Sequence, residues 1–472
     1  MTRLVQSSRL RASGASASLA EGRLLSKRAE AGPQTDAYLA DCDRLVTARS
    51  ATEPSWLRNL RRQGIEHFVD AGFPTTRDEE WKFTSVAPIA DRHFAPAQDG
   101  QSGLTTDLVE RWAGTLGGYR LVLVNGAYAP QFSVGGLPAG VHVSSLRSIL
   151  ATNPAAVEPY LGRFASPDRQ AFTALNTGFL QDGAFVWIPP GTIIEQPISL
   201  LFVSASPETA SVSHPRVLIV AGDRSQARIV EGYAGPPGQE YFTNAVTEVV
   251  VGSGAVVDHY KLQRESQRAC HIGSMYVHGT RDSTFSSHSI AFGGALVRND
   301  IIAVLDGEGG DYTLNGLYLV DGRRLIDNHT TIDHAKPHCG SHEMYKGILS
   351  GHARAVFNGK IIVRPDAQKT DAKQTNKALL LSDDAQINTK PQLEIFANDV
   401  KCTHGAAVGQ LDEDAIFYLR ARGLDLQQAR DMLIQAFAGD VLNRIRIEPL
   451  RKSLEAHLLS ELPAAGGPAH QQ

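Results

Sequence analysis

The sequence predicts a mainly β protein: a parallel β-helix with helical regions before and after it. Three observations predict this fold: a long series of short strand-like runs between residues 119 and 408, almost no helical periodicity between them, and irregular turn spacing. A solenoid accommodates such a series better than a sandwich or barrel, because each rung buries its inward side chains against its neighbours. We therefore prefer a degenerate parallel β-helix to two tandem sandwiches.

Length and composition bound the domain organisation. The 472 residues, 42% of them hydrophobic, allow several domains, since a domain typically has about 100 to 200 residues. We divide the chain into an extension (1–35), an N-terminal helical region (36–118), the β-helix (119–408) and a C-terminal helical domain (409–472). The longest apolar runs, such as 198–203, are too short to cross a bilayer, so we expect no membrane span and no secretory signal.

Charge and cysteine usage exclude several function classes. The net charge is −4 and the pI about 6.5, so no global basic field predicts a nucleic-acid partner. The four cysteines are widely spread without a CxxC pair, which is typical of thiols in a reducing compartment. We expect a cytoplasmic chain. The alternative is a plastid, because the extension is rich in Arg, Ser and Ala with no acid before Glu21, as in a transit peptide.

The N-terminal helical region follows from apolar residues that recur at helical spacing. Within it, Thr76 and Glu79 fit a capping box after a Gly/Pro turn, which predicts a helix that begins there and buries Trp81.

The strand-like runs of the predicted β-helix are apolar and β-branched, and Gly, Asn and Asp separate them. They cover residues 121–124, 185–188, 217–220, 246–251, 256–262, 301–305, 317–320 and 378–381. A solenoid has open edges that must be covered or paired, so we expect its body to dock to a partner.

Three helices are expected in the C-terminal domain. Asp412 can cap the first, and Asp425 with Gln428 opens the second. Gly439 then separates a third run, 441–462. The simplest role of these helices is to cap the end of the solenoid.

Common catalytic signatures are missing from the sequence. It contains no GxxxxGK[ST], GxGxxG, GxSxG or HExxH motif, so any nucleotide hydrolysis must come from a partner. What remains is a region rich in His and Cys. Its first part contains His338, Cys339 and His342, in a stretch interrupted by Pro and Gly that can also be a plain turn between rungs.

The second part is the pair Cys402 and His404. In an extended strand these side chains share a face with Val400, which places a soft nucleophile beside a proton acceptor. Such a pair suits sulfur handling, metal binding or acyl chemistry. The structural alternative is that Cys402 is a small buried hydrophobic residue.

Three function classes remain open at this point. The first is a scaffold and interaction protein. The second is an autonomous metal-dependent or Cys-His enzyme on a β-helix, which predicts turnover by the isolated chain. The third is a carbohydrate-binding or cleaving β-helix, which predicts a groove with aromatic side chains or paired carboxylates, and the aromatic content of only 7% weakens it.

Six motifs sample nearly the whole chain after about residue 36, in order. They are GFPTTRDEEWKFT (72–84), DNHTTIDHAKPHCGSHEMYKGIL (327–349), VFNGKIIV (356–363), AKQTNKALLL (372–381), DVKCTHGAAVG (399–409) and DAIFYLRARG (414–423). In these motifs the chain resembles the SufB/SufD family of SUF iron-sulfur cluster assembly scaffolds. The CTHG sequence at 402–405 departs from the acid-bearing V-E-H-E type of SufB and favours the SufD branch.

The resemblance implies a right-handed β-helix and a non-enzymatic subunit of a SufBCD complex. Such a subunit pairs with SufB through its β-helix and binds the SufC ATPase through its C-terminal helices, while a cysteine desulfurase system supplies sulfur as persulfide. His404 would then lie at the SufB interface and hold a transient iron-sulfur cluster with a SufB cysteine, and Cys402 is the secondary candidate beside it. Flavin binding is associated with such complexes, but no fingerprint here locates a flavin. The residues expected to dock SufC are Asp412, Phe417, Tyr418, Arg420 and Arg422.

Overall fold

In this computed structural model, the described residues are 33–49, 53–97, 104–114, 116–205 and 210–462. The expected extension therefore lies outside them, apart from residues 33–35, which begin helix α2 (Pro33–Arg49). The chain forms two compact units. The first contains residues up to 93 together with 166–180, and the second contains 94–165 together with 181–472.

The first unit is helical. Its elements are α2, α3 (Ser55–Ala71), the 3₁₀ turn η1 (Glu79–Trp81), α4 (Ala87–Ala90) and α7 (Ala171–Gly178). Helices α3 and α7 pack closely at Gly64, where a Cβ atom would lie 2.6 Å from the backbone nitrogen of Gly178. Helix α7 was not predicted from the sequence, because its eight residues are too few to show a helical period inside a strand-rich region.

The predicted capping box at Thr76 and Glu79 is wrong. The segment makes only the single turn η1, whose N-cap is Asp78, and the Asp78 side chain makes no capping hydrogen bond there. Instead, the carboxylate of Asp78 accepts a hydrogen bond from the backbone N–H of Thr75 (2.7 Å), a local turn that competes with helix formation. Trp81 is half-buried rather than buried, with its ring against Phe172.

The second unit is a parallel β-solenoid of about seven turns, so the predicted fold class is confirmed. Before the regular rungs come β1 (Ala95–Pro96), α5 (Thr106–Ala113), β2 (Tyr119–Val124), β3 (Ala127–Tyr128), η2 (Pro130–Phe132), β4 (His142–Ser145), α6 (Leu146–Thr152), η3 (Pro154–Ala156), β5 (Gly183–Ile188), β6 (Ile198–Val203) and β7 (Ser211–Ser213). The rungs are β8 (Arg216–Ala221), β9 (Gln226–Ala234), β10 (Tyr241–Val251), β11 (Val256–Arg264), β12 (Cys270–Gly279), β13 (Thr284–Ala291), β14 (Leu296–Leu305), β15 (Asp311–Val320), β16 (Leu325–His334), β17 (Gly340–Leu349), β18 (Arg354–Val363), β19 (Asp371–Leu380), β20 (Gln386–Ile395) and β21 (Lys401–Gly409). Every predicted strand run overlaps one of these strands.

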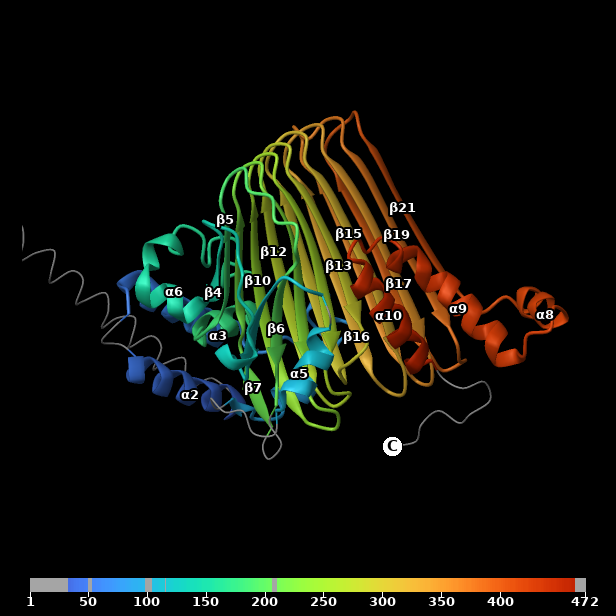
Figure 1. Cartoon of the computed structure of the whole chain (residues 1–472), viewed down its shortest axis with the longest axis horizontal. Coiled ribbons are helices and arrows are strands. Elements are labelled where there is room, and N and C mark those ends of the chain that lie inside the picture. Colours follow the sequence, from blue (N-terminus) through green and yellow to red (C-terminus); the bar gives the residue numbers. More distant parts are fainter. Residues whose placement is uncertain (1–32, 50–52, 98–103, 115, 206–209, 463–472) are drawn as a thin grey trace, which may run out of the picture. The chain divides into compact units, whose positions relative to one another are not determined.

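From β8 onward, successive strands alternate between two sheets (Figure 1). The first sheet has the order β20-β18-β16-β14-β12-β10-β8-β5-β4, and the second has the order β21-β19-β17-β15-β13-β11-β9-β6-β2-β3. From β8 and β9 onward all pairs are parallel and in continuous register, for example Asn299 opposite Asn328. Because side chains alternate along each strand, one face of each sheet points into the shared interior, the lumen, where a continuous hydrophobic core forms.

The C-terminal helices are α8 (Glu413–Ala421), α9 (Leu426–Leu442) and α10 (Glu448–Glu461). As predicted, Asp412 accepts hydrogen bonds at the start of α8, and Asp425 with Gln428 forms a capping box on α9. The predicted break at Gly439 is wrong: α9 continues through it, and the chain turns only after Leu442. A single glycine inside a helix costs only about 1 kcal/mol, and burial of the neighbouring Ala438 and Val441 offsets it.

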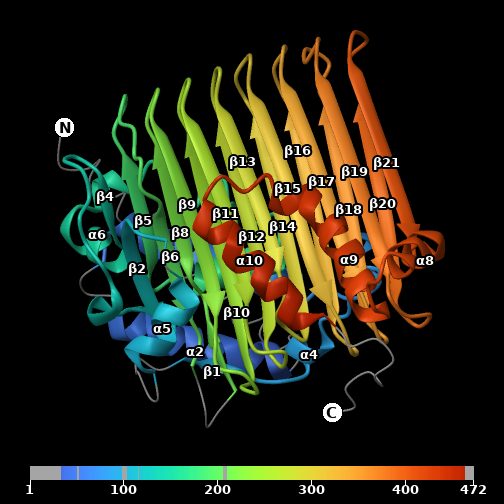
Figure 2. The same ribbon diagram turned by 45° about the vertical axis from the view of Figure 1, so that its right-hand side comes forward.

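These helices do not cap the end of the solenoid as expected. Helices α9 and α10 lie along the outer face of the second sheet (Figure 2), where Ile434, Val441 and Leu454 join Leu317 and Ile348 in one apolar cluster. The buried ammonium group of Lys346 on β17 fixes α9 by donating hydrogen bonds to the Phe437 carbonyl (2.8 Å) and to the Asp440 carboxylate. The last rung of the solenoid therefore remains uncovered by these helices.

No described helix has the length and apolar character that a membrane span requires. None of the four cysteines forms a disulfide, as expected.

A buried ion pair provides a test of the fold. Glu248 on β10 accepts a hydrogen bond from Arg216 (2.6 Å), and both side chains are fully buried. Its carboxylate also accepts the backbone N–H groups of Gly162, Phe164 and Ala165. The substitution Glu248→Ala removes the buried acceptor that these donors share, so we expect a loss of about 3–5 kcal/mol in the free energy of unfolding, measured by denaturant titration.

The exposed pair of Arg268 and Glu240 is the matched control. Arg268→Ala should cost no more than about 1 kcal/mol, because solvent screens an exposed pair. Equal losses for the two substitutions would contradict the role assigned to Glu248.

Candidate functional site

The candidate site lies on the last rung of the solenoid, formed by β20 and β21. In each sheet the last strand pairs on one side only, β20 with β18 and β21 with β19. Nearly every residue of β21 is exposed, and so are three large apolar side chains at this end: Ile395 (40% exposed), Phe396 (62%) and Val408 (48%). An exposed strand edge with apolar neighbours is a typical docking edge for another β-structure.

Cys402 and His404 lie on this last strand, on one face of it, as the alternation predicts. Cys402 is in register with Ala372 of β19, and His404 is in register with Gln374. Because Ala372 and Gln374 are buried, this is the face that points toward the lumen. His404 itself is exposed, since no further strand covers it.

The surroundings of Cys402 favour its structural interpretation in the isolated chain. The thiol is half-buried and packs with Leu393, Ala397 and Val400. Burial raises the pKa of Cys402, so the thiol stays protonated near neutral pH and is a weak ligand and nucleophile. The imidazole of His404 is therefore the more accessible donor of the pair.

The structure does not bring the other three candidates to this pair. His338 lies in a turn with a positive φ of 58°, and its exposed imidazole is 4.0 Å from the Glu308 carboxylate. Cys339 is buried, and its thiol donates to the carbonyl oxygen of Gly307 (3.3 Å). His342 is exposed on β17, a strand separated from β21 by β19. A cluster role for these residues remains a prediction without geometric support.

Two buried residues that were not predicted from the sequence lie on the two strands nearest to that of His404 in its sheet. In the second sheet, Glu343 of β17, Gln374 of β19 and His404 of β21 are in register, which makes a ladder on the lumen face. The Gln374 side-chain amide donates to the Glu343 carboxylate (2.7 Å). Burial raises the pKa of Glu343 to about 7, against the opposing effect of its hydrogen bonds. The alternation of apolar and polar residues could not identify these two residues, because polar side chains occur on both faces of these strands.

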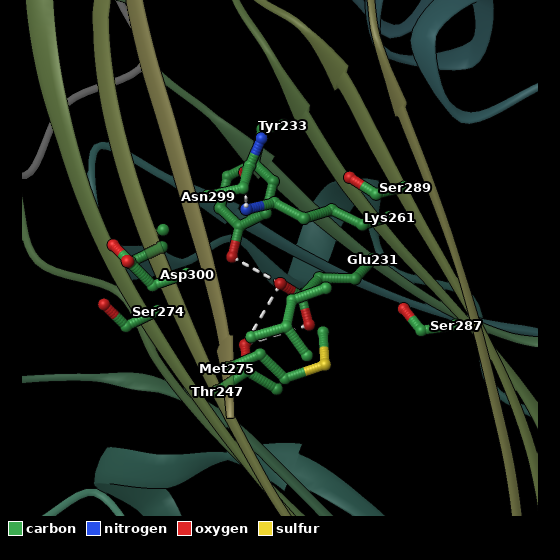
Figure 3. A pocket seen from close by; sticks show the side chains of 13 residues that line it. Glu231, Tyr233, Thr247, Lys261, Ser274, Met275, Ser287, Ser289, Asn299 and Asp300 are labelled. Atoms are coloured by element: carbon green, nitrogen blue, oxygen red, sulfur yellow. Dashed lines mark hydrogen bonds between the residues drawn. The ribbon is translucent and has the colours of Figure 1, made fainter. Parts of the chain in front are cut away.

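A second polar group fills the lumen farther from the last rung (Figure 3). Glu231 accepts hydrogen bonds from Tyr233 (2.7 Å) and Thr247, while Lys261 donates to Asn299 (2.8 Å). Glu231 also pairs with His259 (3.2 Å). Burial alone would raise the pKa of Glu231, but His259 and Lys261 hold it at about 2. Burial lowers the pKa of Lys261 to about 8.

The best explanation of this second polar group is a structural role in the interior of the solenoid. The cavity that it lines has a volume of only about 10 Å³, enough for one water molecule. Buried charges must be paired, and these are paired with one another.

The residues expected to dock an ATPase lie on α8 or just beyond it. Phe417 is 75% exposed and Tyr418 56% exposed, although both are large and apolar. The guanidinium group of Arg422 stacks on the Tyr418 ring at 4.7 Å, Arg420 is exposed, and Asp412 is the N-cap of the helix. Helix α8 therefore exposes two aromatic side chains, one of which contacts an arginine.

The donor set at the last rung is incomplete for a metal centre. Within the described part of the chain, no three His, Cys, Asp or Glu side chains are grouped so that they could hold a metal ion. Any centre that uses His404 must therefore take further ligands from elsewhere.

These features define a class: a parallel β-solenoid protein with an open last rung and helices packed along the outer face of one sheet. Two family descriptions match the chain, "SufBD protein N-terminal region" over residues 36–200 and "SUF system FeS cluster assembly, SufBD core domain" over residues 202–437. The chain belongs to the SufBD family of SUF iron-sulfur cluster assembly proteins, as the resemblance of its motifs indicates.

Named relatives agree with this assignment. An iron-sulfur cluster assembly SufBD family protein of Synechocystis is 35% identical over 415 residues, which cover 86% of this chain and 91% of the relative. The iron-sulfur cluster assembly protein SufD of Escherichia coli is 31% identical over 404 residues, covering 85% and 92%. A chloroplastic protein of Arabidopsis thaliana, ABCI7, is 29% identical over 427 residues, covering 88% of each chain.

The raised thiol pKa of Cys402 predicts slow alkylation. In the isolated chain, iodoacetamide should modify Cys402 more slowly at neutral pH than it modifies glutathione in the same solution, and the rate should rise at higher pH than for glutathione. Mass spectrometry of the peptide that contains Cys402 measures this rate, with Cys402→Ser as the blank. If the alkylation rate of Cys402 rose at the same pH as that of glutathione, or at a lower pH, the thiol would be activated.

The raised pKa of Glu343 predicts a pH-dependent stability. The folded protein holds this proton more tightly than the unfolded chain, so the stabilisation is present below the ordinary pKa of 4.5 and is lost as the pH rises to about 7. Relative to Glu343→Gln, the wild type should therefore lose up to about 3 kcal/mol of unfolding free energy between pH 4.5 and 8. The control is Glu413→Gln, at an exposed position, and the wild type should show no such loss relative to it. If the difference in unfolding free energy between the wild type and Glu343→Gln did not change with pH, the raised pKa of Glu343 would be refuted.

Proposed function

We propose that this chain is a non-catalytic scaffold subunit of a SufBCD complex. Together with SufB it assembles nascent iron-sulfur clusters at the subunit interface, and the SufC ATPase drives their transfer to apoproteins. The single observation that carries the proposal is the open last rung, which presents His404 and three exposed apolar side chains at an unpaired strand edge. We place the complex in the cytoplasm, with a plastid as the alternative that the chloroplastic relative supports.

The unpaired edges of β20 and β21 support pairing with a second β-helix. Their outward backbone N–H and C=O groups have no strand to bond within the described chain, and they can continue the parallel ladder into a partner. Ile395, Phe396 and Val408 would lose their exposed apolar surface on docking, which contributes about 25 cal/mol per Å². SufB, the other member of this family of β-helices, is the partner we propose for this edge.

In this proposal the iron-sulfur cluster is bound transiently and then passed on, and the side chains of the last rung suit transient binding. His404 supplies an exposed imidazole, whereas the Cys402 thiol is protonated and half-buried. Imidazole in place of one thiolate makes an iron-sulfur centre less negative and changes its reduction potential. Ligands divided between two chains would also separate when the chains move apart, which provides a route for release.

The exposed patch on α8 supports docking of SufC. Aromatic and arginine side chains dominate the binding energy of many protein interfaces, and Phe417, Tyr418 and Arg422 present this combination. Helix α9 follows α8 directly and is fixed to β17 through Lys346. A movement imposed on α8 by the ATP cycle can therefore reach the second sheet, whose last strand carries His404.

Substitution of His404 tests the cluster site. In the copurified complex, His404→Ala should reduce iron and acid-labile sulfide at least about tenfold after anaerobic assembly, while SufB and SufC still copurify. His352→Ala is the matched control, since His352 is also exposed but lies in the turn between β17 and β18, and it should retain the full cluster content. Full cluster content in His404→Ala would remove His404 from the site.

Two exposed phenylalanines test the two docking surfaces against each other. Phe417→Asp on α8 should weaken SufC binding at least about tenfold and leave SufB bound, because aromatic anchors at interfaces typically contribute 2 kcal/mol or more. Phe396→Asp at the last rung should do the reverse. Pull-down of each variant with SufB and SufC separately measures both effects, and loss of SufC from Phe396→Asp but not from Phe417→Asp would overturn the assignment.

A further inference from the structure

The side chain next to His404 on the lumen face is the amide of Gln374. Gln374 is in register with His404 on the neighbouring strand, on the same face, and parallel strands lie about 4.8 Å apart. Only 2% of Gln374 is exposed. Residues so paired in a parallel ladder are direct side-chain neighbours.

The orientation of this amide follows from its other contacts. The Gln374 Nε2 donates to Oε2 of Glu343 at 2.7 Å, which leaves Oε1 as the end that has no hydrogen-bond partner. Gly359 on the opposite sheet provides the space for this arrangement, because a Cβ atom at that position would lie 2.1 Å from Nε2. The amide is thus held from behind, and its oxygen is a buried acceptor without a donor.

An unsatisfied buried acceptor is unfavourable, so a donor is expected beside it. The nearest amide on the same strand face, that of Asn376, already donates to Thr389 across the lumen (2.8 Å). The remaining in-register neighbour of Gln374 is His404, and a ring N–H is the donor that it offers.

We propose that Gln374 is a positioning residue for His404: its Oε1 accepts the N–H of one ring nitrogen and thereby fixes the tautomer and the ring orientation. The other ring nitrogen then carries its lone pair outward, toward the open edge. Glu343 acts through Gln374 by holding the amide nitrogen. This ladder of carboxyl, amide and imidazole groups is the kind of outer-shell support that prepares a histidine to bind a metal.

The inference rests on the proposed function for the purpose of the ladder, but not for its existence. The tautomer of His404 is a property of the chain without iron or partner, so it can be measured directly. Ring-nitrogen NMR of the full chain labelled with ¹⁵N-histidine gives it, and the loss of one spin system in His404→Ala assigns the signals. The wild type should show one dominant tautomer, and a mixture like that of free histidine would overturn the proposal without any further variant.

Gln374→Met removes the acceptor and keeps the size of the side chain. We expect the tautomer ratio of His404 to shift about fivefold or more toward the mixture, as the loss of one hydrogen bond implies. The same substitution at Gln392, on β20 of the last rung, should leave the ratio unchanged. So should Glu343→Gln, because its amide oxygen can still accept from Nε2 of Gln374. An unchanged ratio in Gln374→Met would mean that a water molecule satisfies Oε1 and that Gln374 does not position the ring.

A second readout separates this proposal from the cluster site itself. In the copurified complex, Gln374→Met should lower cluster content or iron affinity about 10-fold to 100-fold with SufB still bound. If His404→Ala leaves the cluster content intact while Gln374→Met shifts the tautomer, the proposed function fails and the positioning role stands. If His404→Ala abolishes the cluster and Gln374→Met changes neither readout, the positioning role fails alone.

Discussion

In-register parallel pairing of successive rungs is the constraint on which the rest of the solenoid depends. Each rung satisfies its backbone N–H and C=O groups with the rung before it and the rung after it, in both sheets. The ladder therefore cannot end within itself. The helices that could have covered the last rung lie instead along the outer face of the second sheet, where Lys346 and an apolar cluster hold them. An open edge is the physical consequence, and it is where the candidate site lies.

The same register organises the interior. Side chains at equivalent positions stack along the lumen, so a polar residue on one rung needs a partner on the next or across the lumen. Glu231, His259 and Lys261 meet this need in the middle of the solenoid with short hydrogen bonds and a water-sized cavity. Near the open end, Glu343 and Gln374 meet it only in part, and the next position in the stack is His404. His404 and the polar side chains of the interior near it therefore belong to one in-register ladder.

Much of the fold could be predicted from the sequence. Short β-branched runs separated by Gly, Asn and Asp predicted the strands, and the capping residues Asp412 and Asp425 predicted two helix starts. The helix breaks were less predictable, because tertiary burial carries α9 through Gly439 and a local turn at Asp78 replaces the expected helix. The helix α7 was missed because it is short and lies inside the strand-rich region. The position of Cys402 and His404 on one face of the strand could be predicted from the alternation of side chains alone. Glu343 and Gln374 did not, because only the register between strands shows that they stack behind His404.

The central claim is that β21 is an edge built to receive another β-helix, and hydrogen exchange tests it most directly. In a parallel strand, alternate backbone amides point to either side, so about half of those in residues 401–409 should exchange quickly in the isolated chain. Addition of SufB should protect these amides strongly and leave those of α8 unchanged. Rapid exchange along β21 in the presence of saturating SufB would contradict the claim.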